Sequence, residues 1–202
     1  DNHFNMTRFS RRFGCDHQKT NTGPRKQPNG TPDADLKEIA LTLDLLGRRI
    51  REELGMKFGV HAHLGSQIQN QHEIDVIMDA TRPENVGLVL DTGHITMAGM
   101  DPVALAKKLG HRVIEYHFKD TAKSDRGGTK NVPTPQRDMM NDPYFYPLGE
   151  GGVDFPAIMA YLRSIKWQGD LNVELDTSPW RPPMESARIT AHYIRTVLKL
   201  EL

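Results

Sequence analysis

The chain has 202 residues with 26 basic and 26 acidic side chains, and its 37% hydrophobic content is ordinary for a globular protein with one sizeable core. This charge balance argues against nucleic acid or a membrane surface as the main partner, since both select a basic face. The single cysteine, Cys15, excludes an intrachain disulfide, and no apolar run approaches the roughly 18 residues of a membrane span.

Residues 1–34 are polar and rich in Gly, Pro, Asn and Arg, which predicts an irregular N-terminal segment with at most one short element around Phe9–Cys15. From residue 35 onward, apolar residues recur with helical or strand periodicity. The predicted helices are Asp35–Leu54, Glu73–Thr81, Pro102–Leu109, Phe155–Ile165 and Met184–Leu198. The predicted strands are Met56–His63, Val86–Leu90, Arg112–Phe118 and Asp170–Leu175. Strands that alternate with helices predict an α/β fold with a parallel sheet.

Each predicted strand ends, on its C-terminal side, in residues that can bind metal or move protons. In chain order these are His61 and His63, then Asp91, then His117, Lys119 and Asp120, then Glu174 and Asp176. Chemistry in parallel α/β folds gathers at the carboxyl ends of the strands. Asp91, His117 and Glu174 form a mixed oxygen and nitrogen ligand set that suits Mn²⁺, Co²⁺, Fe²⁺ or Zn²⁺. We therefore predict that these three residues bind one divalent metal ion.

Each of these residues also has a purely structural interpretation. A lone histidine at a strand end is usually a hydrogen-bonded structural group, and an Asp before Thr-Gly often caps a turn. Lys119 has an ion pair with Asp120 or Glu115 as its structural alternative. Four successive strands with such endings favour a joint site over four separate coincidences.

Five stretches carry a resemblance to a known family. They are VHAHLGSQIQ at 60–69, LVLDTGHITMAGMDP at 88–102, RVIEYHFKD at 112–120, PLGEGGVDFPAI at 147–158 and LNVELD at 171–176. By the order and spacing of these stretches, the chain resembles the sugar phosphate isomerase/epimerase superfamily with its xylose isomerase-like TIM barrel. Within that superfamily it is most similar to the inosose dehydratase-like branch.

The resemblance implies a (β/α)₈ barrel with one divalent metal ion, such as Mn²⁺, Co²⁺, Zn²⁺ or Mg²⁺, held by Glu/Asp/His/Glu-type ligands. Asp91, His117 and Glu174 match three of these ligands. The fourth position is open between His63, Gln69 and water, because Gln69 stands where many relatives carry Glu.

The family pattern also bears on the extent of the chain. A full barrel takes about 250 residues, and by this pattern the chain starts near the fourth strand. We therefore expect residues 35–202 to form the C-terminal part of a single barrel domain that is incomplete at its N-terminal side. Open sheet edges favour association, which predicts a homo-oligomer. The cysteine content fits a reducing compartment and predicts a cytoplasmic protein, although a chain that begins with Asp leaves open a preceding targeting segment.

The chemistry that the resemblance implies is proton abstraction next to a carbonyl in a small sugar or polyol, as in isomerases and epimerases of carbohydrate metabolism. Glu174 is then both metal ligand and base, and proton transfer falls to His61, His63 and His94. The expected substrate-binding residues are Lys119, Gln69, Asp176, Arg137 and Glu150. The long aperiodic stretch 120–153 follows a strand end, which favours a substrate lid that includes Tyr144 and Tyr146.

Three alternatives accompany this interpretation. The first is an inosose dehydratase-like lyase, which eliminates water from a keto-polyol. The second is a non-catalytic or partner-dependent subunit, which Gln69 and the missing strands support. The third is an apurinic-site endonuclease with several zinc ions, which the neutral charge of the chain disfavours.

Overall fold

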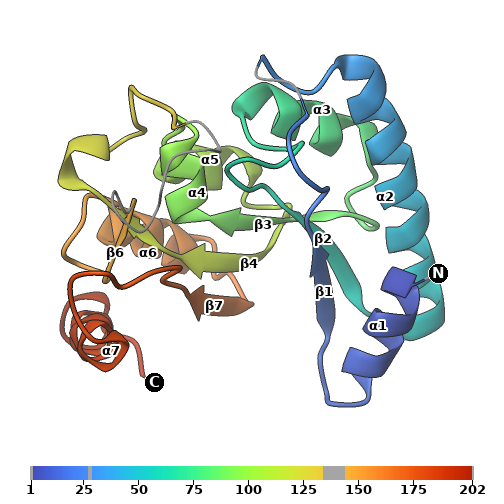
Figure 1. Ribbon diagram of the computed structural model, residues 1–202. Helices are drawn as coiled ribbons and strands as arrows, with labels where there is room; N and C mark the ends of the chain where they lie inside the picture. Colours follow the sequence, from blue (N-terminus) through green and yellow to red (C-terminus); the bar gives the residue numbers. More distant parts are fainter. Residues whose placement is uncertain (1, 27–28, 134–143, 202) are drawn as a thin grey trace. The chain divides into compact units, whose positions relative to one another are not determined.

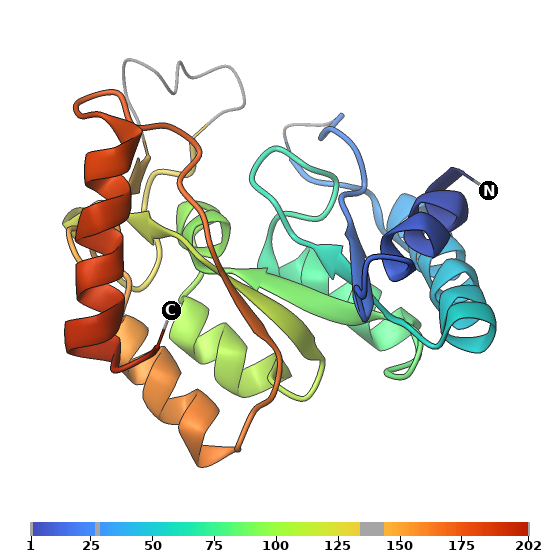
Figure 2. The ribbon, with the colours of Figure 1, turned by 90° about the horizontal axis from the view of Figure 1, so that it is seen from below.

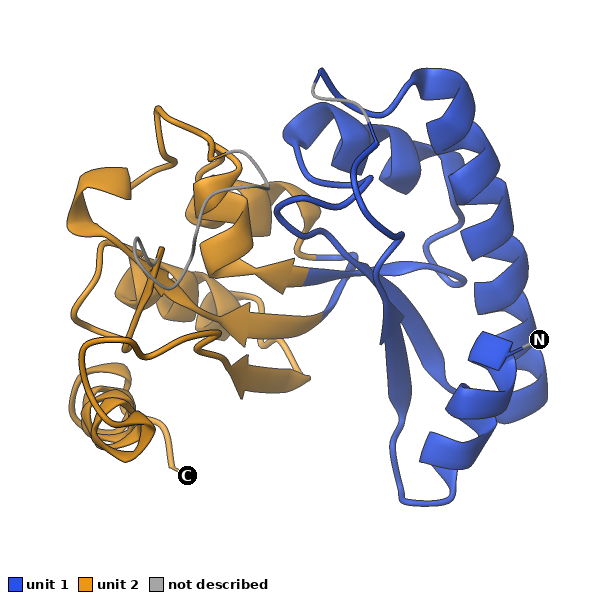
Figure 3. Ribbon diagram, viewed as in Figure 1, with its two compact units in different colours: residues 1–89, 111–114 blue, residues 90–110, 115–202 orange. Residues whose placement is uncertain are grey.

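The computed structural model describes residues 2–26, 29–133 and 144–201 (Figure 1). The chain divides into two compact units, residues 1–89 with 111–114 and residues 90–110 with 115–202, called unit 1 and unit 2 (Figure 3). The hydrogen-bonded strand order is β1-β2-β3-β4-β7, and β3 (Gly87–Asp91) and β4 (Val113–Phe118) each contribute residues to both units.

Unit 1 consists of parallel strands and the helices that connect them. Strand β1 (His17–Thr20) pairs with β2 (Lys57–His61), which pairs in turn with the first residues of β3. The helices are α1 (Asn2–Arg11), α2 (Asp33–Leu54) and α3 (Gln71–Ala80). Helix α2 ends at Gly55, whose φ of 65° is the left-handed conformation that glycine adopts without strain.

The prediction of an irregular segment over residues 1–34 is wrong for α1 and β1. Helix α1 buries Phe4 and Thr7, which are spaced to share one helical face. Strand β1 reads HQKT, and all four residues are half-buried. Its extended conformation depends on pairing with β2, and no apolar alternation in these four residues could signal that pairing. Strand β1 is therefore part of the folded sheet.

Unit 2 pairs β4 with β7 (Asp170–Val173) in parallel, with Glu115 opposite Asp170 and Phe118 opposite Val173. Its helices are α4 (Thr92–Met97), α5 (Pro102–Leu109), α6 (Phe155–Ser164) and α7 (Pro183–Tyr193). Helix α7 continues into a π-helical turn, Ile194–Leu198, which contacts α6 (Figure 2). The core of this unit contains the fully buried aromatic residues Tyr116, Phe118, Phe145 and Phe155.

The predicted strands from residue 56 onward are confirmed, and so are the five predicted helices, with ends that shift by a few residues. Three features of unit 2 were not predicted. Helix α4 is only one and a half turns long, and the aperiodic stretch contains a short antiparallel pair, β5 (Asp120–Thr121) with β6 (Phe145–Tyr146), and a 3₁₀ turn at Lys123–Asp125. Within the described residues, we find no helix that is both long and apolar enough to cross a membrane.

Candidate metal centre

Asp91 is the last residue of β3 and the N-cap of α4. Its Oδ1 accepts a hydrogen bond of 2.9 Å from the backbone N–H of His94. Its Oδ2 lies 3.5 Å from Nδ1 of His117 and 3.2 Å from Nζ of Lys119. The side chain is fully buried. One carboxylate oxygen therefore fixes the start of a helix, while the other points at the side chains of β4.

His117 lies in β4 and is 1% exposed. Its Nδ1 is 3.2 Å from Oε1 of Glu174, and its Nε2 is 3.2 Å from Oε1 of Glu115. Burial opposes the charged ring, but hydrogen bonds with Asp91, Glu115 and Glu174 outweigh it and raise the pKa of His117 to about 10. The imidazole is thus surrounded by carboxylates on both of its nitrogen edges.

Glu174 directly follows β7, where its backbone N–H donates to the carbonyl of Phe118 at 3.1 Å. This bond extends the β4–β7 register by one residue and carries the Glu174 side chain to His117. Its Oε2 also accepts from Nζ of Lys119 at 3.1 Å. The hydrogen bond from His117 is the main reason that the pKa of Glu174 falls to about 2. Glu174 is therefore a carboxylate at every physiological pH, and its side chain is 30% exposed.

Lys119 places a buried cation among the acidic groups. Its Nζ lies 3.2 Å from Asp91, 3.1 Å from Glu174 and 2.9 Å from Asp176, and it contacts Nε2 of His94 at 3.1 Å. Burial works against the ammonium, but the neighbouring carboxylates outweigh it and raise the pKa of Lys119. The side chain is 1% exposed and stays charged because these carboxylates replace its water shell.

Contacts with Lys119 explain the residues at positions 92 and 93 of the stretch Asp91-Thr92-Gly93-His94. The Thr92 hydroxyl donates to the carbonyl of Lys119 at 2.7 Å and accepts from the Lys119 N–H at 2.9 Å, which ties the end of β3 to the end of β4. A Cβ atom at Gly93 would lie 2.6 Å from Cγ of Lys119. Glycine is needed here to leave room for the lysine stem, and not because of a special backbone angle.

The predicted ligands suit a divalent metal ion in their chemistry and in the two distances that involve His117. Bonds of roughly 2.0–2.2 Å in a tetrahedral site place neighbouring donor atoms about 3.3–3.6 Å apart. Nδ1 of His117 lies 3.5 Å from Oδ2 of Asp91 and 3.2 Å from Oε1 of Glu174, which is close to this spacing. Two carboxylates and one imidazole form a donor set suited to Mn²⁺, Co²⁺ or Zn²⁺.

Two further predicted residues lie beside this centre. Asp176 has a 32% exposed side chain, and its Oδ2 lies 3.9 Å from Nε2 of His94. His94 is buried and packs edge-on against Phe145, with 5.1 Å between ring centroids. The structure thus brings His94, Lys119 and Asp176 together with the three ligands.

Asp120, named with His117 and Lys119 from the sequence, has a structural role. Its two carboxylate oxygens accept hydrogen bonds from the backbone N–H groups of Thr121, Gly149, Gly151 and Val153 at 2.9–3.1 Å. Asp120 is 1% exposed. It therefore fixes the turn at 149–153 to the end of β4.

Glu150, at the tip of this turn, forms an ion pair of 2.9 Å with Arg181, which follows β7 in unit 2. Tyr146 packs on Trp180 with 5.5 Å between ring centroids, and Tyr144 is buried. Two loops at the carboxyl ends of β4 and β7 thus contact each other. Arg137 lies outside the described residues, and the lid function of the stretch 120–153 stays a prediction.

Three predicted site residues belong to unit 1. His61 is buried at the end of β2, with its ring edge-on to His63 at 5.4 Å. Nδ1 of His63 contacts the carbonyl of Leu64 at 2.7 Å. The Gln69 side-chain oxygen accepts from the Gly65 N–H at 2.6 Å, so it stabilises the turn after β2. The roles of these residues in proton transfer, ligation or substrate binding stay predictions.

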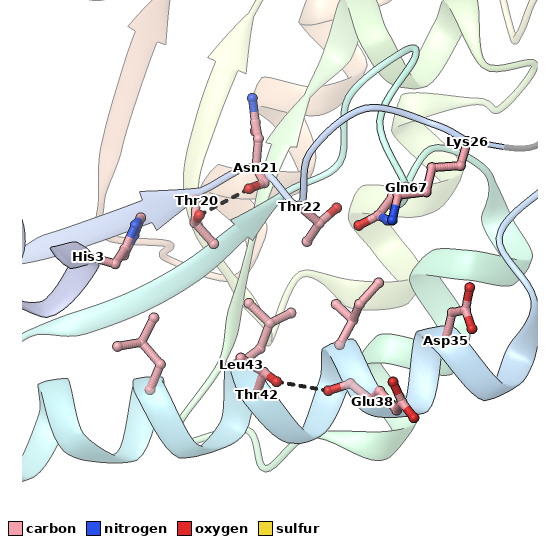
Figure 4. A pocket seen from close by; sticks show the side chains of 12 residues that line it. His3, Thr20, Asn21, Thr22, Lys26, Asp35, Glu38, Thr42, Leu43 and Gln67 are labelled. Atoms are coloured by element: carbon pink, nitrogen blue, oxygen red, sulfur yellow. Dashed lines mark hydrogen bonds between the residues drawn. The ribbon is translucent and has the colours of Figure 1, made fainter. Parts of the chain in front are cut away.

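Unit 1 also contains a pocket of about 660 Å³. Its lining includes Thr20 at the end of β1 and Leu43 of α2, which lie opposite each other, and Asp35 nearer the start of α2 (Figure 4). None of the residues predicted for the metal centre lines this pocket. We therefore assign it no part in the chemistry of that centre.

Sequence reasoning did not give a site role to Glu115, Thr92, Gly93 or Arg181. For Glu115 a signal was present, because residues two apart in a strand share a face and Glu115 precedes His117 by two. Thr92, Gly93 and Arg181 owe their roles to tertiary contacts, which a single sequence does not reveal.

Comparison with known proteins identifies the family. The family model described as the xylose isomerase-like TIM barrel matches residues 5–197. The chain belongs to this family. The resemblance and the fold class predicted from the motifs are therefore confirmed.

Curated relatives of the chain include inosose dehydratases. That of Lactiplantibacillus plantarum is 33% identical over 81% of this chain and 54% of its own length. That of Lacticaseibacillus casei is 29% identical over 86% of this chain and 58% of its own length. The chain thus spans little more than half the length of these relatives.

Solved structures share the fold. The match to a sugar phosphate isomerase/epimerase from Parabacteroides distasonis has a TM-score of 0.73 and 18% identity, and it covers 98% of this chain and 63% of the other chain. The match to the IolI protein, whose crystal structure contains a zinc atom, has a TM-score of 0.72 and 20% identity. It covers 98% of this chain and 68% of the IolI chain.

Proposed function

We propose that the chain carries the metal-binding part of an enzyme that eliminates water from a keto-polyol, as an inosose dehydratase-like lyase. The observation that carries this proposal is the convergence of Asp91 and Glu174 on Nδ1 of His117 within 3.5 Å. The curated relatives, which are inosose dehydratases, favour elimination of water over other reactions of this family.

The chain's own residues have distinct tasks in this proposal. Asp91, His117 and Glu174 hold the cation, which when bound supplies Lewis-acid polarisation of the substrate's carbonyl and hydroxyl oxygens. The low pKa of Glu174 keeps it in the ionised form that both ligation and acceptance of a proton require. Asp176, with a partly exposed side chain, binds substrate oxygens, and the buried Lys119 holds the Asp176 carboxylate in place.

Elimination requires a base that removes the proton next to the carbonyl and an acid that protonates the departing hydroxyl. Glu174 is the candidate base, because its side chain is 30% exposed and can meet a substrate. His61, His63 and His94 are the candidate proton donors. Burial of His94 beside Lys119 limits its direct access to a substrate and favours a role through Lys119.

The second candidate is a sugar isomerase or epimerase, which returns the proton to carbon instead of expelling a hydroxyl. Fold neighbours with such names favour it, among them L-ribulose 3-epimerase with a TM-score of 0.72. The same three ligands would serve either reaction. Three further points stay predictions: binding of a sugar or polyol without turnover, the homo-oligomeric state and the cytoplasmic location.

Metal binding tests the centre directly. We expect the wild-type chain to bind about one Mn²⁺, Co²⁺ or Zn²⁺ by calorimetry, and Asp91→Ala and His117→Ala to lose this binding. His192→Ala is the matched control, because His192 is exposed on α7. Unchanged binding in both site variants would refute the assignment.

Activity separates the two reactions. The metal-loaded chain is incubated with a keto-inositol or a ketohexose in D₂O and followed by NMR. Loss of water from the keto-inositol supports the dehydratase, and an epimerised or isomerised ketohexose supports the alternative. Metal binding without any change in either compound would favour a non-catalytic or partner-dependent chain.

A further inference from the structure

Glu115 is a buried acidic residue beside the metal centre. It lies in the middle of β4 and is 4% exposed. It precedes His117 by two residues, so both side chains point to the same face of the strand. Removing a carboxylate from water costs several kcal/mol unless hydrogen bonds compensate it. One such compensation is the contact of 3.2 Å between Oε1 of Glu115 and Nε2 of His117.

The two nitrogens of His117 have different neighbours. Nδ1 is directed at Asp91 and Glu174, whereas Nε2 is directed at Glu115. The neutral imidazole that binds a metal has one N–H and one lone pair. Without a metal ion, both nitrogens carry an N–H that faces a carboxylate, because a carboxylate can only accept. A cation held by Asp91 and Glu174 would take the place of the Nδ1 proton, whereas Nε2 keeps its proton on the side of Glu115.

We propose that Glu115 is a positioning residue that fixes the ring orientation and tautomer of His117, so that Nδ1 faces the metal ion. This inference rests on the proposed metal site. A ring turned by 180° about its Cβ–Cγ bond would lose the bond to Glu115 and move Nδ1 away from Glu174. Hydrogen-bond partners of metal-bound histidines typically contribute 10–100-fold in metal affinity.

The test compares zinc binding by the wild-type chain, Glu115→Leu and Glu115→Gln in competition titrations. Leucine removes the acceptor, and we expect zinc to bind about 10–100-fold more weakly. Glutamine keeps an oxygen that accepts the Nε2 proton, so it should restore most of the loss. Glu185→Gln is the control for removal of a negative charge, because Glu185 is exposed on α7.

A spectroscopic measurement on the wild-type protein completes the test. In the zinc-loaded chain, ¹⁵N NMR of the imidazoles should show His117 protonated on Nε2 and bound through Nδ1. Coordination through Nε2 overturns the proposal, even if Glu115→Leu fails to fold. A folded Glu115→Leu variant that binds zinc within about threefold of wild type also overturns it. Failure of the wild-type chain to bind zinc would instead refute the metal site itself.

Discussion

Replacement of Lys119 by methionine tests whether a buried cation holds the acidic centre together. Methionine has a similar length and no charge, so it fills the space beside Gly93 but leaves Asp91, Glu174 and Asp176 without their ammonium partner. The metal-free protein should then contain three carboxylates with only the His117 imidazolium left to balance them.

The distances set the expected size of the effect. At about 3.1 Å and an effective dielectric constant of about 20, Coulomb's law gives roughly 5 kcal/mol for each contact. Desolvation of the ammonium offsets much of the sum, and breaking a buried ion pair typically costs about 3–5 kcal/mol. At about 2–4 °C per kcal/mol for a chain of this size, Tm should fall by roughly 6–20 °C.

Thermal unfolding in the presence of a chelator measures this loss. Lys107→Met is the control, because Lys107 is exposed on α5. Addition of Mn²⁺ or Zn²⁺ should raise the Tm of Lys119→Met by more than that of wild type, because a bound cation replaces the missing charge. A Tm within about 3 °C of wild type without metal would refute the proposed electrostatic role of Lys119.

Three other expectations follow from the same contacts. Without metal, Tm should be highest between the ordinary pKa values of 4.5 for glutamate and 6.5 for histidine. The stability that ionised Glu174 contributes is lost as pH falls toward about 2, and the stability that charged His117 contributes is lost as pH rises toward about 10. A His117→Gln variant with the same decline of Tm at alkaline pH would contradict the second expectation. Asp120→Ala should lower the free energy of unfolding by about 2–6 kcal/mol, because the buried N–H groups of Thr121 and Val153 lose their acceptor. Hydrogen exchange of the Gly149 amide should accelerate, and retained protection would count against this role of Asp120. Gly93→Ala should lower the free energy of unfolding by about 1–3 kcal/mol, because the added methyl group overpacks the side chain of Lys119. An unchanged midpoint of urea unfolding would exclude that clash.

The sequence was most informative where local pattern and function coincide. Asp91, His117 and Glu174 each end or follow a strand, and parallel strands bring their carboxyl ends to one edge. Their proximity in the structure therefore follows from the strand pattern alone. The alternation of strands and helices likewise needed only apolar periodicity.

The sequence was least informative where structure depends on distant partners. Strand β1 is four polar residues that become a strand by pairing with β2, 40 residues later. Lys119 was predicted to bind substrate, but its ammonium contacts Asp91 from one segment of the chain and Glu174 and Asp176 from another. Gln69 could be a ligand by its position, but in the structure its amide oxygen completes a local turn.

The Asp120 carboxylate has an evolutionary consequence. It joins the end of β4 to the turn at 149–153, so both ends of the intervening stretch are anchored by backbone N–H groups. Backbone groups are present whatever the side chains, and loop-closure entropy grows only slowly with loop length. Exposed residues of this stretch, such as Lys123 and Lys130, can thus change while the buried Phe145 and the anchored ends keep Lys119 and His117 in position. We expect a chimera that carries a relative's stretch, with Phe145 kept, to fold with Asp91, His117 and Glu174 in place.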